Sequence, residues 1–183
     1  MNAVAETQER RATKEEVEDF SSITPKDRPR ALTVRVIMTP EVFTARPEWT
    51  LLEAARTMRD RRVSGLPVVD EHENLVGILS EWDILADLDR AVGVGTVRGI
   101  LDLLLEAKEG RAATARLEQC IRRLEKARVA ETMVHRVVTV DPETSMGEAA
   151  RLLRKYSVHR LPVMDGGRLI GIVTDENIVD ALS

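Results

Sequence analysis

Two short stretches place a hydroxyl and a second polar side chain three residues apart, where an apolar strand is expected to run into a helix. They are Ser80 with Asp83, after the apolar residues 76–79, and Thr174 with Asn177, 94 positions later. A Ser or Thr here caps a helix, and the residue three positions on lies on the same side. The Asp83 carboxylate only accepts hydrogen bonds and suits two adjacent sugar hydroxyls, while the positive helix end suits phosphate. A plain helix cap also explains either stretch when it is taken alone.

The two stretches are corresponding parts of an internal repeat. Between Met38 and Asp70, adding 95 to the residue number gives the same residue at about 15 of 33 positions. The turn that follows is one residue shorter in the second copy, so the offset falls to 94. Agreement at both core and turn positions predicts one architecture that is formed twice.

Each copy is expected to fold as β-α-β-β-α, which places the chain in the α+β class. The first copy has a strand at 42–45, a helix from the cap Thr50 to about Arg62, strands at 66–70 and 75–79, and a helix from Ser80 to about Leu88. The second copy has a strand at 137–140, a helix capped by Ser145 with Glu148 at the capping-box position, strands at 161–165 and 169–173, and a closing helix. We therefore expect a first repeat over residues 31–90 and a second over residues 128–183.

The remaining residues form an N-terminal segment and a linker between the repeats. Residues 1–30 are polar and charged, and we expect a flexible tail. Residues 91–127 are expected to be a helical insert, because two apolar patterns at helical spacing flank Gly110. Their members are Val97, Ile100, Leu101, Leu104 and Leu105, then Leu117, Cys120, Ile121 and Leu124. These faces pack either on the chain's own repeats or on a second subunit, and Cys120 is expected to be a buried small hydrophobe.

Composition argues against several classes of protein. The net charge of −4 and the absence of a basic stripe argue against nucleic-acid binding. No run of about 18 apolar residues predicts a membrane span, and the N-terminus lacks an apolar signal region, so a cytoplasmic protein is expected. The three histidines show no metal-ligand spacing. Asp83 has no evident nucleophile or second acid beside it, so no enzyme is expected.

Each copy resembles a CBS domain, and the pair resembles a CBS tandem, or Bateman module. The signatures are Met38-Thr39, Leu66-Pro-Val-Val-Asp70 and Gly77-Ile-Leu-Ser80-x-x-Asp83-Ile84, matched by Met133, Val158-His-Arg-Leu-Pro-Val-Met-Asp165 and Gly171-Ile-Val-Thr174-x-x-Asn177-Ile178. The resemblance covers roughly residues 33–88 and 128–182. It implies two units around a pseudo-twofold axis with two clefts between them. It further implies a regulator that binds AMP, ADP, ATP or S-adenosylmethionine and that often forms a homodimer.

The resemblance also assigns residues to the clefts. Asp83 would hold the ribose, the adenine would lie near Val138, and His159 and Arg160 would meet the phosphates. The first cleft is then formed by Ile78, Ser80, Asp83, Val138, His159 and Arg160. The second cleft has Phe43, Ser64, Thr174 and Asn177. We expect it to bind more weakly, because an amide replaces the carboxylate and the Ser64-Gly65 loop offers no cation.

Two functions from different classes remain after this reading. The first is a regulatory, ligand-sensing module that needs no cofactor and acts on an effector protein the sequence does not identify. The second is a protein-interaction or dimerisation module without effective ligand binding. It is favoured by Asn177, by the missing cation in the second cleft and by the apolar faces of the insert.

Overall fold

A computed structural model describes residues 32–93 and 111–182, all within the unit Leu32–Ser183. The expected tail at 1–30 lies outside the described residues. So do Gly110 and the first apolar pattern of the insert, from Val97 to Leu105.

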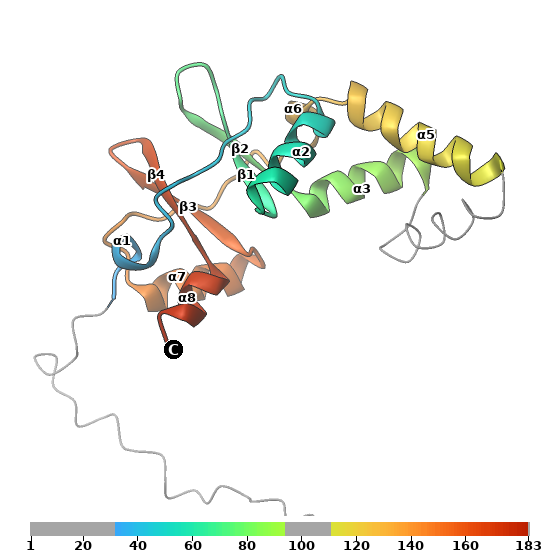
Figure 1. Ribbon diagram of the computed structural model, residues 1–183. Helices are drawn as coiled ribbons and strands as arrows, with labels where there is room; N and C mark the ends of the chain where they lie inside the picture. Colours follow the sequence, from blue (N-terminus) through green and yellow to red (C-terminus); the bar gives the residue numbers. More distant parts are fainter. Residues whose placement is uncertain (1–31, 94–110, 183) are drawn as a thin grey trace, which may run out of the picture. The chain divides into compact units, whose positions relative to one another are not determined.

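The predicted α+β tandem is confirmed (Figure 1). The first copy contains α1 (Val34–Ile37), α2 (Leu51–Arg61), β1 (Gly65–Val69), β2 (Leu75–Ser80) and α3 (Glu81–Val92). The second contains α6 (Val129–Thr132), α7 (Met146–Tyr156), β3 (Arg160–Asp165), β4 (Arg168–Thr174) and α8 (Asp175–Asp180). Helix α5 (Arg111–Lys126) precedes the second copy.

Polar caps fix where the longer helices begin. Thr50 and Glu53 close a capping box on α2, with Glu53 N donating to Thr50 Oγ1 at 3.1 Å and Thr50 N to Glu53 Oε2 at 2.7 Å. Ser145 likewise accepts from Glu148 N at 3.2 Å on α7. The Glu148 carboxylate does not close a box there, because it pairs with Arg151 at 2.6 and 2.8 Å.

Both sheets are antiparallel pairs with the same irregularity. β1 pairs with β2 and β3 with β4, and the register shifts between Val68 and Val69 and between Val163 and Met164. The shift falls at corresponding positions of the two copies, as the internal repeat predicts. The inner side chains Leu66, Val68, Leu161 and Val163 are fully buried.

The expected strands at 42–45 and 137–140 shrink to single parallel bridges. Ala45 N donates to the Pro67 carbonyl at 2.9 Å and Val69 N donates to the Ala45 carbonyl at 3.0 Å. Continuing this ladder by one step would require an amide hydrogen on Pro67, which proline lacks. The bridge between Val140 and Val163 is formed in the same way, and Pro162, which also lacks an amide hydrogen, prevents its extension.

The two copies exchange their first segments. Val34 of α1 is fully buried in the core of the second copy, whereas Val129 and Met133 are buried in the core of the first. Backbone bridges accompany the exchange, between Thr39 and Ile172 and between Ile78 and Val134. Each packing unit therefore contains a segment of the other sequence repeat.

Helix α5 lies along the helices of the first copy. It contacts α2 and α3, and in Figure 1 it runs beside α3. Cys120 is buried against Leu88 and Val92, as expected for a small hydrophobe. Leu117 and Ile121 remain more than 40% exposed. The second apolar pattern of the insert thus packs partly on the chain's own first copy.

Candidate functional site

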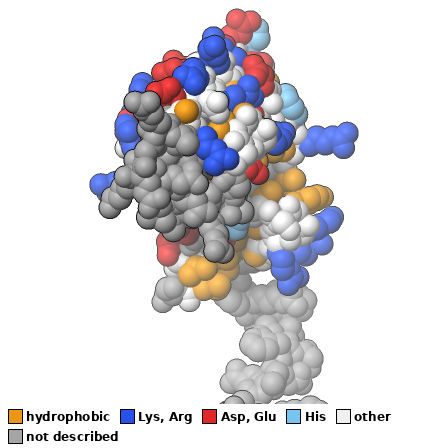
Figure 2. Space-filling model, turned by 90° about the vertical axis from the view of Figure 1, so that its right-hand side faces the viewer, with side chains coloured by type: hydrophobic (Ala, Val, Ile, Leu, Met, Phe, Trp, Pro, Cys, Tyr) orange, Lys and Arg blue, Asp and Glu red, His pale blue; other side chains and the backbone are white. Residues whose placement is uncertain are grey.

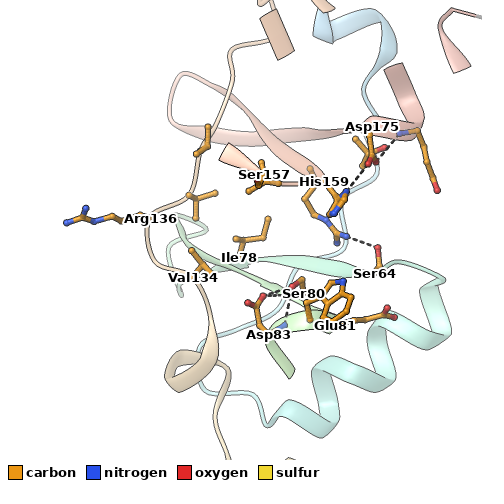
Figure 3. A pocket seen from close by; sticks show the side chains of 17 residues that line it. Ser64, Ile78, Ser80, Glu81, Asp83, Val134, Arg136, Ser157, His159 and Asp175 are labelled. Atoms are coloured by element: carbon orange, nitrogen blue, oxygen red, sulfur yellow. Dashed lines mark hydrogen bonds and ion pairs between the residues drawn. The ribbon is translucent and has the colours of Figure 1, made fainter. Parts of the chain in front are cut away.

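A cleft between the copies, in the part of the chain that the structure describes, has a volume of about 590 Å³. Its lining comes from β2, the start of α3, residues 134–138, residues 157–160 and the start of α8. The structure brings together here all six residues predicted for the first cleft, which are Ile78, Ser80, Asp83, Val138, His159 and Arg160. In Figure 3, Ile78, Ser80 and Asp83 lie across the cleft from Ser157 and His159. Their role in binding stays a prediction.

Ser80 and Asp83 form a reciprocal cap that leaves one carboxylate oxygen available. Ser80 N and Ser80 Oγ donate to Asp83 Oδ2 at 2.7 and 2.5 Å, and Asp83 N donates to Ser80 Oγ at 3.3 Å. Both contacts fall on Oδ2, and no hydrogen bond from residues 32–93 or 111–182 reaches Oδ1. The cap therefore fixes the carboxylate and leaves an ionic acceptor at the cleft wall.

His159 and Arg160 form the opposite wall and are both held by partners. His159 Nδ1 lies 2.9 Å from Asp175 Oδ2, and Arg160 Nη2 donates to Ser64 Oγ at 2.6 Å. The imidazole is largely exposed, whereas Arg160 is half-buried. A guanidinium held in this way presents its remaining donors in a fixed plane, which suits phosphate.

Carboxylates surround the Arg160 guanidinium. Burial lowers the pKa of Arg160, and the negative charges of Glu81, Asp175, Asp83 and Glu176 oppose that shift. A guanidinium keeps its proton at neutral pH in either case. Sequence analysis missed the carboxylates Glu81, Asp175 and Glu176, although each lies within three residues of a predicted helix cap.

Arg160 lies across Gly65 on β1. A Cβ built on Gly65 would lie 2.7 Å from Arg160 Cζ and 2.9 Å from the Leu79 carbonyl oxygen. Real Cβ atoms do not approach other atoms so closely. Glycine at this position is therefore what leaves room for the guanidinium.

The second cleft, of about 550 Å³, is lined by all four of its predicted residues, Phe43, Ser64, Thr174 and Asn177. Its cap repeats that of the first, because Thr174 N and Oγ1 donate to Asn177 Oδ1 at 3.0 and 3.1 Å. Asn177 Nδ2 lies 3.4 Å from Thr39 Oγ1. The amide oxygen is thus occupied, and no ionic acceptor replaces it at this position.

The second cleft carries cations that sequence analysis overlooked. The Ser64-Gly65 loop has none, as expected, but Arg59, Arg61 and Arg62 at the end of α2 line the cleft. Arg61 Cζ lies 4.6 Å from the centre of the Phe43 ring, a cation–π distance. The basic run that ends the predicted helix was the available signal.

Other kinds of site find little support in the described residues. Within 32–93 and 111–182, no group of three His, Cys, Asp or Glu side chains is placed to hold a metal ion. In the same ranges no helix is both long and apolar enough to cross a bilayer. Figure 2 shows basic and acidic side chains interspersed over the face that it draws, without a continuous basic stripe.

Known proteins share this arrangement. The family profile of the CBS domain matches residues 34–90 and 127–183. The chloroplastic CBS domain-containing protein CBSX1 of Arabidopsis thaliana is 30% identical over 142 residues, which are 77% of this chain and 59% of that protein. The chain thus spans little more than half the length of this plant relative.

Two solved structures resemble the chain over most of its length. The crystal structure of CBSX2, an Arabidopsis thaliana protein, in complex with AMP is 31% identical, with a TM-score of 0.59 over 82% of this chain and 95% of that one. The CBS domain pair of protein MJ0100 in complex with 5′-methylthioadenosine and S-adenosyl-L-methionine is 25% identical, with a TM-score of 0.58 over 83% and 96%. On its two matched repeats, the chain belongs to the CBS-domain family and is a CBS domain pair protein.

Proposed function

We propose that this chain is a regulatory module that senses an adenosine-containing ligand in the cleft of Ser80 and Asp83. One observation carries the proposal: the open Oδ1 of Asp83 and the guanidinium of Arg160 line the same cavity of about 590 Å³. A ribose needs an acceptor for two hydroxyls, and a phosphate needs a cation with several donors. The two groups meet both needs within one cleft.

Each part of such a ligand has a matching wall. Asp83 Oδ1 accepts from the ribose hydroxyls, and the apolar side chains of Ile78 and Val138 cover the adenine. Arg160 donates to the phosphate, and His159 adds charge when it is protonated. The two solved relatives that hold AMP and S-adenosylmethionine support this class of ligand.

Charge in the cleft favours a ligand with few phosphates. The carboxylates lining it are Glu81, Asp83, Asp175 and Glu176, against the guanidinium groups of Arg136 and Arg160. Arg136 is exposed, and Figure 3 shows its side chain directed away from the other labelled residues. A triphosphate would bring more negative charge to this acidic rim. We therefore expect AMP to bind more tightly than ATP in the absence of divalent cations.

Calorimetric titration with AMP and adenosine tests the proposal. Asp83→Ala should weaken both ligands at this cleft about tenfold or more, because it removes hydrogen bonds to a charged acceptor worth about 1.5–3 kcal/mol each. Arg160→Ala should weaken AMP far more than adenosine. Asn177→Ala is the matched control and should change little. If the wild type binds AMP and Asp83→Ala binds it equally well, the assignment of Asp83 to the ribose is overturned.

We also propose that the chain forms a homodimer through α7 and α8. Val179 on α8 is 61% exposed and Leu182, just after α8, is 71% exposed, whereas α5 covers the corresponding helices of the first copy. This apolar surface also favours the alternative function, an interaction module that works without ligand. Light scattering tests the proposed homodimer. Val179→Asp should yield monomers, and a monomeric wild type would refute the dimer. The effector and a cytoplasmic location stay predictions.

A further inference from the structure

The two clefts meet at a shared boundary. The residues that line both of them are Ser64, Glu81, Arg160, Thr174 and Glu176. Among these five shared residues, Arg160 carries the positive charge, and Glu81 and Glu176 carry negative charges. The same arginine side chain therefore lines both clefts.

The internal repeat explains why there is one such guanidinium instead of two. Adding 95 to Gly65 gives Arg160, so the two residues are equivalents in the two copies. Gly65 is opposite Ser80 in β1–β2, and Arg160 is opposite Thr174 in β3–β4. A Cβ on Gly65 would lie 2.7 Å from Arg160 Cζ and 2.9 Å from the Leu79 carbonyl oxygen, so a side chain at this position would require both the guanidinium and the strand to shift.

Each cleft also has cations of its own. Arg136 lines the first cleft, and Arg59, Arg61 and Arg62 line the second. Since Arg61 already stacks on Phe43 and Arg59 pairs with Asp60 at 2.8 Å, Arg62 is the second cleft's own group for an anion. A phosphorylated ligand in the second cleft would thus combine Arg62 with the shared Arg160, whereas in the first cleft, where Arg136 is directed away, it would rely on Arg160.

We infer that Arg160 couples the two clefts, so that a phosphorylated ligand in one weakens the binding of a phosphorylated ligand in the other. The inference rests on the proposed function, because it assumes that the first cleft binds a nucleotide. The first phosphate takes the donors of Arg160. The second then faces that phosphate together with Glu81 and Glu176, with no shared cation left to offset them. A ligand without phosphate does not bind Arg160, so its affinity does not depend on whether the other cleft is occupied.

Sharing is tested by titrating AMP into single-cleft backgrounds. Asp83→Ala leaves the second cleft as the AMP site, and Asn177→Ala combined with Arg62→Ala leaves the first. Arg160→Ala should weaken AMP roughly tenfold or more in both backgrounds. As a matched control, Arg62→Ala should weaken AMP in the Asp83→Ala background but leave AMP binding at the first cleft of the wild type unchanged. A loss from Arg160→Ala in one background only would overturn the sharing.

Coupling is tested in the wild type by following both clefts with NMR during titrations with AMP and with adenosine. Once one cleft is occupied, the other should bind AMP about tenfold more weakly than it does in the variant where it is the single working cleft. Two adenosine molecules should bind independently. Equal or tighter binding of the second AMP would mean that Arg160 bridges both phosphates and would overturn the inference. So would absence of AMP binding in Asp83→Ala, although the proposed function would stand if the wild type binds AMP at the first cleft.

Discussion

Arg123 on α5 forms a bidentate ion pair with the carboxylate of Asp87 on α3. Its Nε donates to Asp87 Oδ2 at 2.7 Å and its Nη2 to Oδ1 at 2.8 Å, and Asp87 as a residue is 5% exposed. Arg90 adds a longer ion pair of 3.7 Å to the same group. Helix α3 begins directly after the cap Ser80, so this pair ties the helix that carries Asp83 to the linker between the repeats.

The first prediction is that Arg123→Ala destabilises the protein strongly. It leaves the buried Asp87 carboxylate without its bidentate partner, and removing one member of a buried pair costs about 3–5 kcal/mol. We expect a loss of about 3 kcal/mol, because Arg123 is itself one third exposed and Arg90 remains close. Urea denaturation followed by circular dichroism measures the free energy of unfolding.

Arg122→Ala is the control for this substitution. Arg122 lies on the same helix and pairs with Glu118 at 3.3 Å, but both side chains are more than half exposed. Its loss should change the free energy of unfolding by at most about 0.5 kcal/mol. Similar losses from the two variants would show that the Asp87 pair does not anchor α5.

The second prediction concerns acid stability. The hydrogen bonds from Arg123 hold the pKa of Asp87 below its usual value, against the opposing effect of burial. A depressed folded pKa gives stability that is complete above the unfolded pKa of about 3.9 and is lost as the pH falls through the folded pKa. The difference in unfolding free energy between wild type and Asp87→Asn should be constant from about pH 5 to 8 and shrink below about pH 4. A difference that grows in acid would contradict the assignment.

Local spacing predicts the caps well, because a cap depends on residues close in sequence. Ser80 with Asp83 and Thr174 with Asn177 both form the reciprocal contacts that their three-residue spacing indicates. The internal repeat likewise predicts both hairpins. The strand expected at 42–45 fails on a distant residue, because its ladder would need an amide hydrogen on Pro67.

Contacts between the copies were beyond reach of sequence patterns. Val34 and Val129 are apolar in either copy, and nothing in their spacing says that each is buried in the other copy's core. The position of Arg160 between both clefts depends equally on tertiary packing. Arg62 is different, because the basic run at the end of α2 is visible in the sequence. The sequence does not show that these side chains line the second cleft.

The third prediction concerns a close contact between the copies. A Cβ on Gly77 of β2 would lie 2.5 Å from the Sδ atom of Met133, which follows α6. Gly77→Ala should therefore force Met133 to move within a packed core and cost about 1–3 kcal/mol. Adding Met133→Ala to Gly77→Ala should cost less than the sum of the two single losses, because the two residues share this contact.

Gly147→Ala is the matched control for the glycine. Gly147 is the second residue of α7, and a Cβ there would meet nothing within 4 Å. Alanine should raise the free energy of unfolding by about 0.4–1 kcal/mol. If both alanines were stabilising, the approach of Met133 to Gly77 would not constrain the fold.

The last prediction is that Cys120 reacts slowly with thiol reagents in the native protein. Burial against Leu88 and Val92 raises the pKa of its thiol, and the thiolate is the reactive form. Leu117→Cys in a Cys120→Ala background provides an exposed thiol on the same helix, since Leu117 is 43% exposed. It should react at least about a hundredfold faster than Cys120, because local opening of a packed helix costs a few kcal/mol. Denaturant should abolish the difference, and equal native rates would show that α5 does not stay packed on α3.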